Sequence, residues 1–133
     1  MTTIIAMLVG AVSGAGIVIA MLRSGMLAER SGAAILLAAI ASFYPVFAVI
    51  DGDILAAAIH VAIFAAFAIL ATRAYRIGLN LIAGGLIAHG LFDLALGLIG
   101  APGPMWWPLF CAAVDIVAGG LILRLIQTGR VTP

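Results

Sequence analysis

The sequence predicts an all-α, polytopic membrane helix bundle of five transmembrane helices, with its N-terminus outside the cytoplasm and its C-terminus inside. Of the 133 residues, 66% are hydrophobic and 8% are charged, which leaves too few polar groups to cover a water-soluble domain. Five apolar stretches are each close to the roughly 20 residues that cross about 30 Å of hydrocarbon. The arginines lie in alternate links between these stretches. We therefore interpret residues 1–133 as a single transmembrane domain.

Charges, glycines and prolines divide the chain into its predicted spans. No Lys or Arg precedes the first apolar stretch, unlike the start of a cleaved signal peptide, so the first helix is expected to be retained. The links are short, so consecutive helices are expected to lie antiparallel and side by side. The predicted helices cover residues 4–22, 32–50, 54–70, 77–99 and 105–123.

The shortest link is Asp51-Gly52-Asp53. Gly52 can adopt the left-handed conformation that ends a helix, and Asp53 can cap the next helix. These residues favour a hairpin between two spans. The alternative is a four-span protein in which residues 32–70 include a re-entrant segment.

Arginine positions test the number of spans independently of hydropathy. The six arginines fall in the first link, in the third link and after the last span, and the chain has no lysine. With five spans these segments share one side, which the positive-inside rule makes cytoplasmic. The second link carries only aspartates and the fourth carries no charge, as expected for the opposite side. We therefore expect a multi-pass protein of a bacterial cytoplasmic membrane.

Aromatic residues and prolines mark two places near the outer boundary. Pro45 follows Tyr44 and is expected to kink its helix, either as a local bend or in a way that opens a pocket. Trp106 and Trp107 lie where the fifth span begins, and anchoring at the membrane interface is favoured for both over stacking on a ligand. Trp107 is kept as a candidate ligand contact.

Ionisable and polar residues within the spans fall in one band of depth. At 1.5 Å per residue, Tyr44, His60, Asp93 and Cys111 lie about 9 Å below the outer boundary. His89 and Asp115 lie about 15 Å below it. Four helices therefore contribute to one polar region in the outer half of the membrane.

The fourth and fifth spans carry paired motifs that indicate a contact between them. His89 and Asp93 share a helix face, as do Cys111 and Asp115, because each pair is four residues apart. Antiparallel packing puts His89 level with Asp115, so we expect these two side chains to meet. Small residues on the same faces, including Gly85 and Gly119, indicate close helix packing.

The cost of burying two aspartates indicates a role for them. Each central Asp costs about 2.5–3.5 kcal/mol on insertion scales, and together they cost about 5–7 kcal/mol. The only cationic partners at that depth are His60 and His89, so the aspartates either pair with histidine or carry a proton. The alternative is polar glue between helices, at about 0.6 kcal/mol per hydrogen bond. A functional site is favoured.

Three functional classes fit these residues. The first is an acid–base enzyme or binder for a small lipophilic molecule from the outer leaflet, with His89 as proton carrier, Asp115 orienting it and Asp93 as second acid or base. In it, Tyr44, His60, Cys111 and Trp107 contact the ligand, and no metal ligand is assigned. The second is a proton-coupled transporter or channel. The third is a subunit in which His60 and His89 ligate haem, a pigment or a metal.

Several observations disfavour the second and third functional classes, and others exclude particular partners. The inner halves of the spans are nearly free of polar residues, which disfavours transport, and the two histidines differ in depth by about 6 Å, which disfavours shared haem ligation. Without lysine, a Schiff-base chromophore is excluded. The net charge of +1 gives no sign of a nucleic-acid partner. The bilayer is the expected partner, a homo-oligomer is left open, and no cofactor is named.

The motifs F-Y-P-V-F at residues 43–47, H-G-L-F-D at residues 89–93 and P-M-W-W-P-L-F-C-A-A-V-D at residues 104–115 occur together. In this combination the chain loosely resembles a group of small multi-spanning bacterial membrane proteins of unknown function. The resemblance covers about half of the chain. It implies the same choice of His89, Asp93, Cys111 and Asp115, and it carries no activity.

Overall fold

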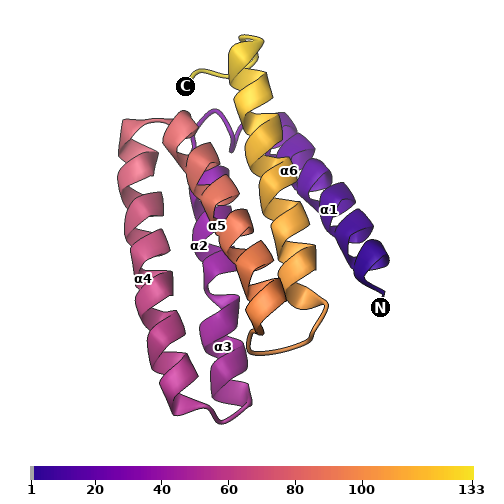
Figure 1. Ribbon diagram of the computed structural model, residues 1–133. Coiled ribbons are helices and arrows are strands. Elements are labelled where there is room, and N and C mark those ends of the chain that lie inside the picture. The colour runs from indigo at the N-terminus through magenta and orange to yellow at the C-terminus, as the bar shows by residue number, and fades with distance from the viewer. Residues whose placement is uncertain (1) are drawn as a thin grey trace.

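The structure, a computed structural model, describes residues 2–133. These residues form six helices and no strand, as Figure 1 shows. The helices are α1 (Thr3–Ser24), α2 (Ser31–Ala41), α3 (Phe43–Ile50), α4 (Ile54–Ile77), α5 (Leu79–Ile99) and α6 (Trp107–Gln127). Helices α2 and α3 follow each other as one span, Ser31–Ile50, which gives five helices of membrane length. The all-helical fold and the number of spans are confirmed, and the four-span alternative is wrong.

The break between α2 and α3 lies at Ser42, one turn before Pro45. Proline has no amide hydrogen to donate to the carbonyl of Ala41, and its ring crowds that carbonyl. The preceding turn tightens in response. The Ser42 amide donates to the carbonyl of Ala39 at 3.1 Å, and the Ser42 hydroxyl donates to the same oxygen at 2.6 Å. The helix is therefore interrupted one turn before Pro45, where the sequence predicted a kink.

Two predicted boundaries are wrong near the arginines. Residues 71–76, expected to be a link, continue α4 as far as Ile77, and Gly78 alone separates α4 from α5. Arginine can remain helical at a membrane boundary because its long apolar stem extends the guanidinium to water, and a cation at a helix C-terminus is favourable. Similarly, α6 extends past the predicted residue 123 to Gln127 and includes Arg124.

The first helix has a different neighbour from the expected one. Helix α3 contacts α4, α4 contacts α5 and α5 contacts α6, but α1 lies along α6 and meets α2 chiefly near their connection (Figure 1). Glycines make this possible. Gly10 lies against the carbonyl of Phe110, and a Cβ at Gly14 would be 2.5 Å from the carbonyl oxygen of Val114. The expectation that all consecutive helices lie side by side is wrong for α1 and α2.

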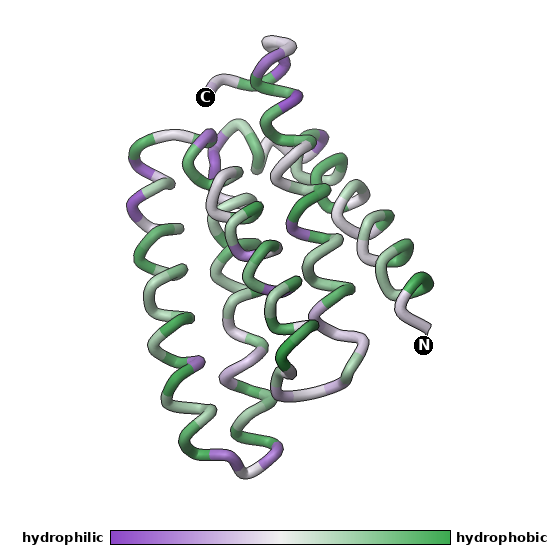
Figure 2. The backbone as a smooth tube through the Cα atoms, in the orientation of Figure 1, coloured by the Kyte–Doolittle hydropathy of each residue, from purple (hydrophilic) through white to green (hydrophobic). Residues whose placement is uncertain are grey.

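Hydrophilic residues gather at the two ends of the bundle, and the helices between the ends are mostly hydrophobic with a few hydrophilic positions, as Figure 2 shows. One end, here the arginine end, carries all six arginines. The other, the aspartate end, consists of the turn Asp51–Asp53 between α3 and α4 and the loop between α5 and α6. The N-terminus and the C-terminus point to opposite ends (Figure 1), as an odd number of spans requires.

An apolar core fills the half of the bundle nearer to the arginine end. It is built from α1, α2, α4, α5 and α6, and the α1–α2 connection adds Leu27. Its bulkiest members that are at most 2% exposed are Val18, Leu27, Leu37, Leu79, Ile82, Leu86 and Ile122. Helix α4 presents many apolar side chains outward, as expected of a helix that faces lipid. Polar side chains within the membrane therefore lie on the aspartate side of this core.

Candidate functional site

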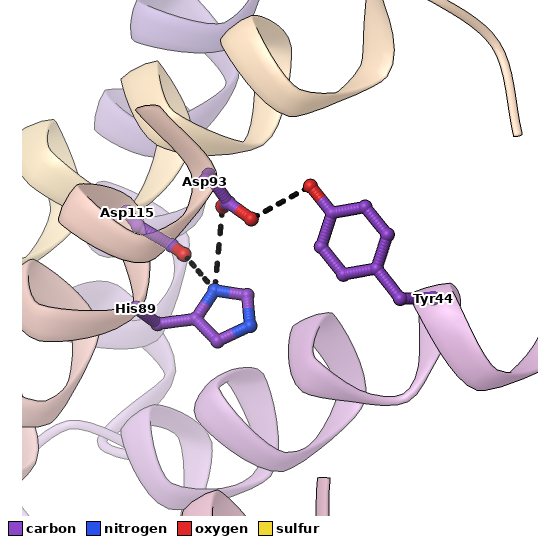
Figure 3. A network of polar contacts seen from close by, with 4 residues as sticks. All are labelled: Tyr44, His89, Asp93 and Asp115. Carbon is purple, nitrogen blue, oxygen red and sulfur yellow. Dashed lines mark hydrogen bonds and ion pairs between the residues drawn. The ribbon is translucent and has the colours of Figure 1, made fainter. Parts of the chain in front are cut away.

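Four polar side chains from three helices meet inside the bundle, and Figure 3 shows them. The Nδ1 atom of His89 on α5 lies 2.7 Å from Oδ2 of Asp115 on α6. The same Nδ1 atom lies 3.3 Å from Oδ2 of Asp93, one turn away on α5. The hydroxyl of Tyr44 on α3 donates to Oδ1 of Asp93 at 2.8 Å. We call these four residues the polar network.

The backbone of α5 and α6 sets the spacing of the network. The i, i+4 relation puts His89 and Asp93 on one face of α5. Gly90 then lets α6 approach, because a Cβ there would lie 2.8 Å from Ile116 Cγ1 and 3.1 Å from Asp115 Cβ. Gly119 allows a second close contact, with the carbonyl of Ala83. The short His89–Asp115 contact thus depends on glycines as well as on the charged residues.

The network is buried, and its two carboxylates have only one imidazole as a possible cationic partner. The relative exposure of its members is 2% for Tyr44, 1% for His89, and 0% for Asp93 and Asp115. Oδ2 of Asp93 and Oδ1 of Asp115 have no hydrogen-bond partner. One imidazole stands between two carboxylates, and the arginines lie at the end of the bundle. The buried network therefore has unused capacity to accept a proton or another positive group.

The orientation of the His89 ring determines which of its two nitrogens contacts the carboxylates. An ionised carboxylate only accepts hydrogen bonds, so its contact with Nδ1 requires a hydrogen on that atom. The second ring nitrogen, Nε2, points away from both carboxylates in Figure 3. Aromatic rings surround the imidazole: the centroid of Phe67 is 4.7 Å away and that of Phe92 is 5.9 Å away. The free nitrogen thus faces apolar surroundings.

His60 lies next to the network without joining its hydrogen bonds. Its ring stacks on Tyr44 with centroids 5.3 Å apart and an interplanar angle of 30°. It also lies at 6.5 Å from Phe92. His60 therefore contacts the outer side of the network, and its depth in the same band agrees with the expectation.

The other two candidates, Cys111 and Trp107, serve packing in this structure. Cys111 is buried with Ile40 and Val114 in a small apolar cluster. Trp107 packs against the rings of Phe43 and Phe47, at centroid distances of 4.8 and 5.1 Å. No hydrogen bond or ring contact between either residue and the polar network occurs among residues 2–133.

Three members of the network have the spacing of metal ligands. One ligand atom from each of His89, Asp93 and Asp115 lies within 4.8 Å of the others. Nitrogen and carboxylate ligands of this kind suit Zn²⁺, Mn²⁺ or Fe²⁺. This grouping differs from the expected haem or metal ligation by His60 and His89, since His60 has no place in it.

Some residues of the site were not expected from the sequence. Phe67 and Phe92 form its aromatic walls, and Gly90 sets the approach of α6. Gly90 directly follows His89, and its position could have predicted the close approach of α6, because small residues mark close helix contacts in membranes. Phe67 carried no signal, since one aromatic residue in an apolar helix is common.

Comparison of the chain with protein-family models, with curated proteins and with solved structures gives no match in any of the three. The resemblance of the H-x-x-x-D and C-x-x-x-D motifs to small bacterial membrane proteins stays a prediction. The site is therefore argued from its own chemistry.

Proposed function

We propose that the polar network is a one-sided acid–base site within the membrane, which binds or converts a small lipophilic molecule. One observation carries the proposal: His89, whose Nε2 is free, is held through Nδ1 by two buried carboxylates that retain unpaired oxygens. We further propose that the arginine end faces the cytoplasm of a bacterium. The buried network then lies in the half of the bundle nearer to the outer leaflet.

The proposed chemistry assigns a role to each member. With a hydrogen on Nδ1, Nε2 accepts a proton from the bound molecule, and the imidazolium that forms is stabilised by Asp115 and Asp93. Asp115, at 2.7 Å, orients the ring. Tyr44 donates to Asp93 and offsets part of its charge. The proton returns from Nε2 to the same molecule or to its product, so the site is restored.

A lipophilic molecule suits the surroundings of His89 better than a water-soluble one. Phe67 and Phe92 present aromatic surface to the imidazole. Lipid surrounds the bundle, so an apolar molecule reaches these helices without crossing water. Exclusion of water also strengthens the electrostatic interactions of the site.

The apolar core favours this one-sided site over the transport alternative. Leu79, Ile82 and Leu86 follow His89 toward the arginine end on α5, and Ile122 does so on α6. All four are at most 2% exposed. A proton or ion that crosses the bundle needs polar groups along this stretch, and the buried residues of the core there are apolar.

The test compares lipophilic molecules that copurify with the wild-type protein and with two variants, His89→Gln and Asp115→Asn. Mass spectrometry of organic extracts should detect one species in near-equal molar amount with the wild type and little of it with either variant. Glu29→Gln, which makes a matched change at the arginine end, should retain the species. Identical extracts from all four proteins contradict the proposal.

Metal binding is the second candidate, because His89, Asp93 and Asp115 have ligand spacing. The same four preparations discriminate it. A stoichiometric transition metal in the wild type, lost from His89→Gln and Asp115→Asn but not from Glu29→Gln, assigns the network to a metal and not to a lipophilic acid–base reaction.

A further inference from the structure

A surface hollow lies at the aspartate end, outside the polar network. Its volume is about 460 Å³, within the range of about 300–1,000 Å³ that small-molecule sites occupy. The turn between α3 and α4 forms one wall and the loop between α5 and α6 the other. The lining residues are Asp51, Asp53, Ala56, His60, Gly100, Ala101 and Pro102.

A defined contact joins the two walls. The amide of Gly103 donates to Oδ2 of Asp51 at 3.1 Å. Gly103 has a φ of +91°, and a Cβ there would collide with the ring of Phe47. The loop is therefore fitted onto the turn, and the hollow is a built feature of the fold.

The hollow is negatively charged, and its lining residues include no arginine. Asp51 and Asp53 are exposed, and Oδ1 of Asp53 accepts from the amide of Ala56 at 2.9 Å. Each aspartate uses one oxygen in these structural bonds, and residues 2–133 supply no hydrogen bond to the other oxygen. All arginines lie at the opposite end of the bundle. A positive group from outside the chain is the matching partner.

His60 supplies a second and independent observation at the same place. It is 8% exposed, lines the hollow, and makes no hydrogen bond with the described residues. Its ring stacks on Tyr44, whose hydroxyl donates to Asp93. A histidine ring that lines a hollow with two carboxylates and makes no hydrogen bond of its own is available to a ligand in that hollow.

We propose that this hollow binds the cationic head group of a lipophilic amine or ammonium compound, whose apolar part lies in the bilayer beside the bundle. The inference rests on the proposed function for the lipophilic ligand and adds its charge class. An anionic head group would meet two carboxylates without compensation. A bare metal ion fits less well, because the cluster with ligand spacing found among residues 2–133 is His89, Asp93 and Asp115.

The test uses single-chain amphiphiles of equal length in mixed micelles with dodecyl maltoside. The probes are dodecyltrimethylammonium, dodecanol and dodecyl sulfate at equal mole fraction. The readout is modification of His60 by diethyl pyrocarbonate, followed by peptide mass spectrometry, with buried His89 as internal reference. Dodecyltrimethylammonium at about ten times its Kd should slow the modification about tenfold. The other two probes should leave the rate unchanged.

The matched variant is the double change Asp51→Asn and Asp53→Asn. Asparagine still accepts from the Gly103 amide and still caps α4, so the charge changes while both structural bonds remain. This variant should lose the protection of His60, and Glu29→Gln should keep it. Apparent Tm in the same micelles gives a second readout that needs no reactive histidine: only dodecyltrimethylammonium should raise it, and only in proteins with both aspartates.

Equal effects of all three probes, or protection that survives the double change, overturn the inference. So does protection by ZnCl2 in place of the ammonium probe. These failures are separable from failure of the proposed function. If a lipophilic species copurifies in a way that depends on His89 and Asp115, but dodecyltrimethylammonium does not protect His60, the proposed function stands. Only the inference of a cationic head group is then wrong.

Discussion

Replacing Tyr44 with phenylalanine isolates a single hydrogen bond of the polar network. The hydroxyl donates to Oδ1 of Asp93 at 2.8 Å, and Asp93 is fully buried with Oδ2 already lacking a hydrogen bond. Phenylalanine keeps the ring that stacks on His60 and meets Phe92 edge-on. The change therefore leaves packing in place and deprives a buried carboxylate of its one donor from α3.

The expected loss follows from the burial of Asp93. Hydrogen bonds to charged groups contribute about 1.5–3 kcal/mol in proteins, whereas bonds between membrane helices average about 0.6 and reach about 1.7 kcal/mol. Both oxygens of Asp93 lose or lack a donor in the variant, so a value near the upper membrane limit is expected, about 1.5 kcal/mol. Tyr75→Phe is the control, because Tyr75 is 47% exposed, and it should change stability by less than about 0.5 kcal/mol.

Reversible unfolding in mixed micelles, titrated with sodium dodecyl sulfate, measures these free energies. The double-mutant cycle with Asp93→Asn sharpens the test, because a neutral amide loses less when its donor is removed. Tyr44→Phe should cost about 1 kcal/mol less when it is combined with Asp93→Asn than when it is made in the wild-type protein. Equal losses for Tyr44→Phe and Tyr75→Phe, or no coupling to Asp93, would refute the reasoning.

Three further predictions concern the bundle around the network. Gly14→Leu should destabilise the protein by about 2 kcal/mol or more, because a Cβ at position 14 would collide with the carbonyl of Val114. Gly16→Ala places its Cβ in open space and should change stability by less than about 0.5 kcal/mol in the same unfolding assay. Asp51→Ala should speed proteolysis of the α5–α6 loop by removing the acceptor of the Gly103 amide, and Asp51→Asn should not. Cysteines introduced near the two chain ends should react with an impermeant maleimide from opposite sides of the membrane, the N-terminal one from outside; reaction from one side excludes five spans.

The sequence contained enough information for the number of spans and the level of the network. A rise of 1.5 Å per residue, counted from the charged links, was sufficient to bring His89 beside Asp115. The hydrogen bond from Tyr44 to Asp93 was beyond this reasoning, since depth says nothing about which way a side chain turns.

Lateral neighbours were the least predictable part of the fold. Hydropathy counts crossings but does not say which helices touch, so α1 was expected beside α2, whereas its glycines fit the backbone of α6. Arginine was also a poor boundary marker, because Arg73 and Arg76 remain helical at the membrane edge. Cys111 shared the depth of the network and Trp107 lay at the start of the same span, and both of them pack in apolar or aromatic surroundings instead.

The contact between His89 and Asp115 is the claim on which the account most depends, and solid-state NMR in lipid bilayers measures it directly. The chain has two histidines, so His60→Gln leaves His89 as the sole source of imidazole signals. An Nδ1–Oδ2 distance of 2.7 Å places the Asp115 Cγ about 3.5 Å from Nδ1. We expect a protonated Nδ1 with dipolar coupling to a carboxyl carbon at that distance, lost in Asp115→Ala. Because Asp93 Oδ2 also lies 3.3 Å from Nδ1, a coupling at about 3.5 Å that persists unchanged in Asp115→Ala would contradict the account.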